Sequence, residues 1–116
     1  MSTLNVTASI GDENALSVRK SLSVTTTGDA LDYRRIDVTT GEVTHTIDTA
    51  IGNAGMCLII NLDSTNFVDV GFATTVYPIR LLAEQATLLP LTPATSALYL
   101  KADTATCEVD IYIREA

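Results

Sequence analysis

The sequence is poor in the residues that build most chemical sites. It has no tryptophan, one histidine and two cysteines in 116 residues, and aromatic residues make up only 5% of it. A single histidine, His45, offers little for acid–base chemistry, and scarce aromatics disfavour stacking against bases or sugars. No P-loop, GxGxxG, GxSxG or HExxH string occurs. We therefore predict a protein that is not an enzyme, with no catalytic, cofactor-binding or metal-binding residue.

An excess of positive charge and long apolar runs are also missing. The chain has 14 acidic and 7 basic residues, which gives a net charge of -7 and a pI near 4.3. Such a chain repels phosphate backbones, so we predict no nucleic-acid partner. No apolar run approaches the roughly 18 residues that span a bilayer, so we predict no membrane partner. Residues 1–15 lack a basic and an apolar segment in the order of a signal peptide, and we expect synthesis and assembly in the cytoplasm of the producing cell.

The two cysteines, Cys57 and Cys107, lie in separate apolar runs. Their spacing matches neither a zinc knuckle nor a CxxC redox pair. The pattern favours two small buried side chains. A structural disulfide between them is the next alternative, and a reactive or metal-binding thiol is the least favoured.

What the sequence does contain is alternation of apolar and polar residues with a period of two, which is typical of strands. Residues 4–10 and 16–24 predict two half-buried strands. Residues 31–39 and 42–51 predict a hairpin, because Thr40-Gly41 between them supplies a short turn.

The second half of the chain is more apolar and predicts further strands. The nearly continuous apolar run at 56–62 indicates a central strand covered on both faces. Pro78 places the strand at 76–82 at a sheet edge or a bulge. The only helical candidate, 79–86, is short and is followed by two prolines, so it predicts one or two turns at most. Other strands are expected at 67–73, 87–91, 97–102 and 105–113.

Together these segments predict an all-β fold. About eight to ten short strands separated by turn signals favour an antiparallel β-sandwich of the jelly-roll type. High threonine, valine and isoleucine content agrees with sheet structure. Without a linker or an internal repeat, we expect one domain over residues 1–116.

One group of polar residues deserves a test as a metal site. Asn61, Asp63, Thr65 and Asn66 carry alternating oxygen atoms of the kind that bind calcium. The segment lacks the glycine and the distal glutamate of an EF-hand loop. It therefore favours a hairpin turn rich in Asx residues.

Other ionisable residues fit ordinary strand positions. His45 is interpreted as a hydrogen-bonded or surface histidine of a strand. Asp29 with Asp32, and Glu108 with Asp110, are interpreted as solvated strand faces. A carboxylate pair for glycoside cleavage is a minor alternative, because no aromatic subsite accompanies these residues.

Five motifs in the second half occur in a fixed order. They are NLDSTNFVDVG at 61–71, YPIRL at 77–81, LLPL at 88–91, LYLKA at 98–102 and a last acidic strand that ends in Arg114-Glu115. In this order they resemble small virion proteins of tailed bacteriophages, of the capsid decoration or cement type. The resemblance covers about half of the chain. Residues 1–50 do not share it, and a glycine common near Ala83-Glu84 is missing here.

The resemblance implies an auxiliary structural protein with a jelly-roll-like fold, often trimeric, on the outer surface of the capsid. Its partner would be the major capsid protein, and it would stabilise the shell by binding the assembled form preferentially. Partner-binding residues stay unassigned, although 1–10 and 92–97 are candidate contact segments. A neck, tail or fibre module of the virion is the first alternative, and a small ligand-binding β module the second.

Overall fold

The computed structural model describes residues 2–14, 16–26, 28 and 30–116, and within these it has ten strands and no helix. The all-β prediction of eight to ten strands is therefore confirmed. The strands are β1 Ser2–Gly11, β2 Ser17–Thr26, β3 Leu31–Val38, β4 Val43–Thr46, β5 Ala54–Asn61, β6 Val68–Gly71, β7 Ile79–Leu81, β8 Ala86–Pro90, β9 Ala97–Ala102 and β10 Cys107–Glu115.

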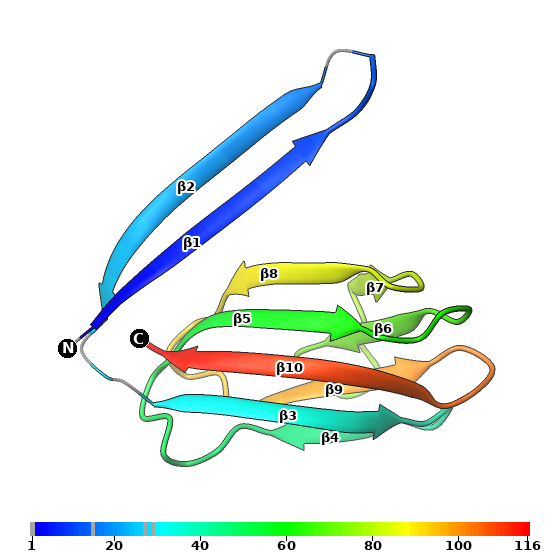
Figure 1. Ribbon diagram of the computed structural model, residues 1–116. Coiled ribbons are helices and arrows are strands. Elements are labelled where there is room, and N and C mark those ends of the chain that lie inside the picture. The colour runs from blue at the N-terminus through cyan, green and yellow to red at the C-terminus, as the bar shows by residue number, and fades with distance from the viewer. Residues whose placement is uncertain (1, 15, 27, 29) are drawn as a thin grey trace.

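Eight of these strands form a sandwich of two antiparallel sheets (Figure 1). One sheet has the order β3-β10-β5-β8, and the other has the order β4-β9-β6-β7. Counted from β3, the eight strands are therefore arranged first-eighth-third-sixth and second-seventh-fourth-fifth. This is the strand order of a jelly roll, so the predicted sandwich type is confirmed.

Two predicted hairpins are wrong. β3 and β4 lie in opposite sheets, where β3 pairs with β10 and β4 pairs with β9. Likewise, the Asx-rich turn after β5 leads to β6 in the other sheet. A turn signal indicates where the chain reverses, but the burial of the inner faces decides which sheet the next strand joins. In a jelly roll the chain repeatedly crosses from one sheet to the other.

The segment 79–86 does not form a helical turn. It holds β7, a turn at Ala83 and Glu84, and the first residue of β8. β7 pairs with β6, with Leu81 opposite Val68, and both side chains are buried. A segment this short has little intrinsic helix stability, so pairing with a neighbouring strand overrides it. As Pro78 predicted, β7 is an edge strand.

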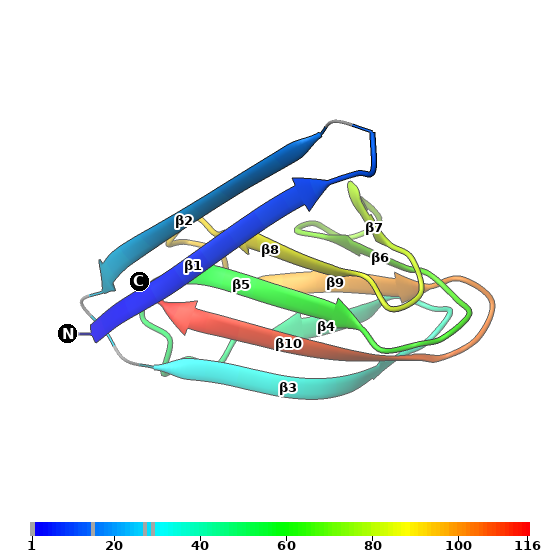
Figure 2. The ribbon, with the colours of Figure 1, turned by 45° about the horizontal axis from the view of Figure 1, so that its top comes forward.

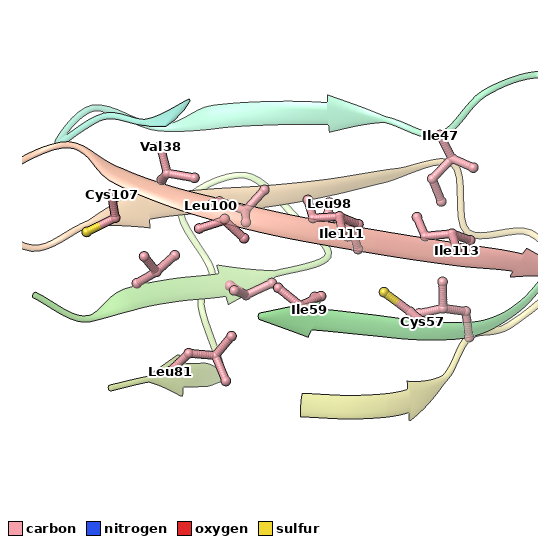
Figure 3. Close-up of a cluster of buried hydrophobic side chains, with 14 of the residues drawn as sticks. Val38, Ile47, Cys57, Ile59, Leu81, Leu98, Leu100, Cys107, Ile111 and Ile113 are labelled. Carbon is pink, nitrogen blue, oxygen red and sulfur yellow. The ribbon is translucent and has the colours of Figure 1, made fainter. Parts of the chain in front are cut away.

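The core lies between the two sheets, where alternate residues of each strand point inward (Figure 3). β5 is an internal strand, as its apolar run predicted, but it is not covered on both faces, because Met56, Leu58 and Ile60 on its outer face are only half-buried. Both cysteines are fully buried and free, which confirms small buried side chains and excludes a disulfide. Burial raises the pKa of the Cys57 thiol to about 12, so this thiol is unreactive at neutral pH. The largest fully buried side chains include Val38, Ile59, Leu98, Leu100, Ile111 and Ile113.

β1 and β2 form a separate two-stranded sheet that projects from the sandwich (Figures 1 and 2). We call this hairpin, residues 2–14 and 16–26, the arm. Its projection gives the molecule a radius of gyration of 14.8 Å, compared with about 13 Å for a compact chain of this length. The prediction that both strands are half-buried is wrong for the middle and the outer part of the arm, where Ile10, Val18 and Leu22 are 63%, 55% and 54% exposed.

Candidate interaction surfaces

A buried histidine–aspartate pair links the two sheets. His45 on β4 and Asp32 on β3 are 7% and 4% exposed, and His45 Nε2 donates to Asp32 Oδ2 across 3.2 Å. The same carboxylate oxygen accepts the backbone N–H of Asp48 at 3.0 Å. The prediction that Asp32 lies on a solvated strand face is therefore wrong. Its carboxylate is buried between the sheets, where it accepts a hydrogen bond from a histidine of the opposite sheet. Asp29 lies outside the described residues.

This pair has the geometry of a base and its orienting carboxylate, but its position favours a structural role. Each partner is almost completely covered by the sandwich. The surface groove and hollow described below are lined by other residues. We interpret the pair as a hydrogen-bonded link between two edge strands, β3 and β4.

Asp110 is also buried, but on the outer face of the β3-β10-β5-β8 sheet. Arg35 Nε and Nη2 donate to its two carboxylate oxygens at 2.7 and 3.0 Å, and Tyr33 Oη donates at 3.2 Å. The hydrogen bond from the Arg35 guanidinium holds the pKa of Asp110 below its usual range. Asp110 is 4% exposed, so its predicted solvation is wrong, whereas its neighbour Glu108 is solvated as predicted. The arginine and tyrosine side chains cover it.

The oxygen-rich segment after β5 is an Asx turn. Asp63 Oδ2 accepts the backbone N–H groups of Thr65 and Asn66 at 3.0 and 2.6 Å, which lowers the pKa of Asp63. Asn61 Nδ2 donates to three backbone carbonyls, and Asn61 Oδ1 accepts the backbone N–H of Asp63. The oxygen and nitrogen atoms of these side chains therefore form hydrogen bonds that stabilise the loop. In the described part of the chain, no three His, Cys, Asp or Glu side chains are grouped so that they could hold a metal ion.

An apolar groove lies between the arm and the outer face of the β3-β10-β5-β8 sheet, which we call the arm-side sheet. The groove has a volume of about 470 Å³. Leu4 and Val6 of the arm form one wall. The sheet contributes the other wall, with Leu31, Met56, Leu58, Leu88 and Tyr112. We call this space the arm groove.

The end of β10 makes hydrogen bonds to residues near the base of the arm. The backbone N–H of Ala30 donates to Glu115 Oε2 at 3.0 Å, and the backbone N–H of Glu115 donates to the carbonyl of Ala30 at 2.9 Å. Arg114 Nη1 donates to the carbonyls of Gly28 and Ala30, each at 3.3 Å. The end of β10 therefore holds Gly28 and Ala30, which lie shortly before β3.

A second hollow lies over the opposite sheet, β4-β9-β6-β7. It has a volume of about 300 Å³ and contains Phe72, which is 43% exposed, beside Tyr99 of β9. Its remaining lining comes from the loop before β9 and from the first residue of β9, and it includes most of the candidate contact segment 92–97. We call it the Phe72 hollow. The sequence predicted the loop as a contact segment but did not identify Phe72. Phe72 comes close to this loop only because β6 pairs with β9.

The comparisons with known proteins identify no family. No family model matches the chain, and no curated protein matches it. Across the described residues, no helix is long and apolar enough to cross a membrane. A solved structure from Bacillus endospore appendages, described as a novel family of disulfide-linked pili, aligns with 82% of this chain and 96% of its own chain, with 16% identity and a TM-score of 0.49. A likeness at this level supports no statement about function.

Proposed function

We propose that this protein is an auxiliary structural protein of a tailed bacteriophage that binds the outer surface of the assembled capsid and stabilises it. The observation that carries the proposal is the number of large apolar side chains left exposed on an acidic jelly roll. Apolar side chains that gather on one surface mark sites of protein–protein contact, and here they gather around the arm groove. The exposed side chains are Ile10, Leu16, Val18, Leu22, Leu31, Tyr33, Leu62, Phe72, Val76, Leu82 and Leu88.

Two further observations support the capsid as the partner. The motifs at 61–71, 77–81, 88–91 and 98–102 resemble those of decoration proteins. The net charge of -7 favours the outside of the shell, because packaged DNA repels an acidic protein. A protein in this position needs no catalytic site. It stabilises the shell by binding only the assembled form, and repetition over many copies multiplies a modest interface.

The two apolar surfaces lie on opposite faces of the sandwich. The arm groove is on the outer face of the arm-side sheet, and the Phe72 hollow is on the outer face of the other sheet. One face can therefore bind the shell while the other remains available. We assign the Phe72 hollow to the major capsid protein, because its lining includes most of the candidate contact segment 92–97.

Cosedimentation with empty capsids of the phage that encodes the chain tests this function. We expect the wild type to bind at micromolar concentration, and Phe72→Glu to weaken binding at least tenfold because a charge enters the apolar contact. Ser64→Glu, an exposed change at the turn between β5 and β6, should bind like the wild type. A wild-type protein that stays in the supernatant would remove the proposal.

The projecting arm favours a second candidate, a neck, tail or fibre module, because an arm that contacts a neighbouring subunit can join copies in a row. Electron microscopy of phage particles with and without the protein separates the two. Density over the whole shell supports decoration. Density at a single vertex supports the neck or tail position and contradicts the first proposal.

A further inference from the structure

The arm has one apolar face and one polar face. Residues that pair across β1 and β2 lie on the same face, and the pairs Leu4–Val24, Val6–Leu22 and Ile10–Val18 form the apolar one. The other face carries threonine, asparagine and serine, with hydrogen bonds such as Ser23 Oγ to Asn5 Oδ1 at 2.9 Å. The apolar face is half-buried near the base and exposed toward the tip.

An isolated two-stranded hairpin is at best marginally stable in water, and it gains independent stability by packing its apolar face. The arm pairs with no other strand among the described residues. Its own sheet covers only the base of the apolar face, at Leu4 and Val6 in the arm groove. Leu22, which lies opposite Val6 in the middle of the arm, and Ile10 and Val18 nearer the tip remain exposed.

The arm-side sheet offers a surface of matching character. Its outer face exposes Leu31 by 59%, Tyr33 by 44% and Leu88 by 36%. Tyr33 stacks on Tyr112 with ring centroids 4.5 Å apart, which provides a flat aromatic platform. Leu58 and Met56 of β5 lie on the same outer face.

The charges of the two surfaces are complementary. The only charged residues in the strands of the arm are Arg19 and Lys20, and Lys20 lies on the apolar face opposite Ala8. Asp12 and Glu13 lie in the turn at the tip, beyond the strands. The outer face of the arm-side sheet carries one excess negative charge, from Asp37, Glu108 and Asp110 against Arg35 and Arg114. This face of a second copy therefore attracts Lys20 on the apolar face of the arm.

Area decides how the copies are arranged. The outer half of the arm presents a ribbon roughly 17 Å long and 10 Å wide, so one contact between this half and the sheet buries about 330 Å² in total. That is less than the roughly 1,000 Å² expected of a specific interface. A closed two-fold dimer doubles this area, because each copy then both contributes an arm and receives one, and the two contacts bury about 650 Å², which is the size of a weak interface.

We infer that the arm of one copy packs its apolar face onto the outer face of the arm-side sheet of a second copy, in a closed two-fold dimer. The end of β10 holds residues near the base of the arm, and the outer half reaches the neighbour. The inference does not depend on the capsid, and its tests use the purified protein alone. The proposed function and this inference can therefore each fail without the other.

The molar mass in solution is the first test. Light scattering on the wild type at about 100 μM should give at least twice the chain mass of 12.4 kDa. Val18→Glu combined with Leu22→Glu should give the mass of a single chain. The control, Ser17→Glu combined with Ser21→Glu, adds the same charge to the polar face of the same strand and should keep the wild-type mass. A single-chain mass for the wild type, or an equal effect of both double variants, overturns the inference.

Cross-linking between differently tagged copies is the second test. One copy carries Leu22→Cys and the other carries Leu88→Cys, while the buried Cys57 and Cys107 do not compete. Mild oxidation should join the two tags, and replacing Leu22→Cys by Ser21→Cys should reduce the product at least tenfold. A chain with both substitutions that closes an internal disulfide as a monomer shows that the arm folds onto its own sheet, and overturns the inference.

Discussion

At the scale of single residues, the notable feature is that buried carboxylates are satisfied by partners distant in the sequence. Asp32 binds His45 and the backbone of Asp48. Asp110 is held by Arg35 and Tyr33. A buried ionised carboxylate without such partners is strongly destabilising. These contacts therefore fix the positions of β3 and β4 at the edges of their sheets.

Replacing Asp32 tests the link between the sheets. Asp32→Ala leaves the buried His45 and the N–H of Asp48 without an acceptor, so we expect a loss of about 1–3 kcal/mol in the free energy of unfolding. Urea titration followed by circular dichroism measures it. Asp37→Ala, an exposed change on the same strand, should alter stability by less than about 0.5 kcal/mol. Equal effects of the two substitutions would contradict the role assigned to Asp32.

The Arg35–Asp110 pair predicts a dependence of stability on pH. Because the pKa of Asp110 is lowered in the folded state, its contribution is present above the ordinary aspartate pKa of about 4 and is lost as the pH falls through the lowered value. Arg35→Gln should therefore reduce stability at pH 7, and the difference from the wild type should shrink below about pH 4. Urea titrations at several pH values measure this.

Arg34 provides the control for that experiment. It is an exposed neighbour on the same strand, so Arg34→Gln removes the same charge and leaves the Arg35–Asp110 pair in place. It should show no such convergence with the wild type at low pH. A constant difference for Arg35→Gln at all pH values would show that the ion pair does not contribute as proposed.

At the scale of elements, the end of β6 depends on one glycine. Gly71 is buried, and a Cβ atom at this position would overlap the carbonyl oxygen of Val76 and contact the ring of Pro78. The chain can therefore turn back after β6 only because no side chain is present. Glu42 then holds this turn, because it accepts the backbone N–H of Thr75 at 2.7 Å and the hydroxyl of Tyr77 at 2.6 Å.

Gly71→Ala should destabilise the fold by about 2 kcal/mol or more, because backbone atoms rather than a flexible side chain must move. Thermal unfolding followed by circular dichroism measures the effect. Gly41→Ala is the matched control, since the nearest atom to its new Cβ is 3.9 Å away. Gly41→Ala should leave the melting temperature within a few degrees of the wild type. A stable Gly71→Ala protein would show that the turn after β6 is not as close as described.

At the scale of the whole molecule, charge decides which partners are accessible. The net charge of -7 lies on the sandwich, whereas the strands of the arm carry only two positive charges. We predict that the protein forms no complex with duplex DNA at micromolar concentration in about 50 mM salt. Fluorescence anisotropy of labelled DNA checks this. Binding that weakens steeply with added salt would indicate a basic surface and would contradict an outer capsid position.

The sequence by itself determined the class of fold. The two-residue period of apolar side chains predicted strands that each overlap one observed strand, although the one predicted at 42–51 ends at Thr46. Pro78 predicted an edge strand, because proline is a local constraint on the backbone. The buried state of Cys57 and Cys107 also followed from their apolar neighbours. These features depend on residues that are close in sequence, so no knowledge of the other sheet was needed.

Only the tertiary structure decided which strands share a sheet and which apolar faces remain outside. The same alternation occurs in β10, which is buried in the sandwich, and in β1 and β2, which project into solvent. Periodicity shows that a strand has an apolar face but not what covers it. For the same reason, the burial of Asp32 and Asp110 could not be predicted, because His45 and Arg35 reach them only after β3 has paired with β10 and the two sheets have closed.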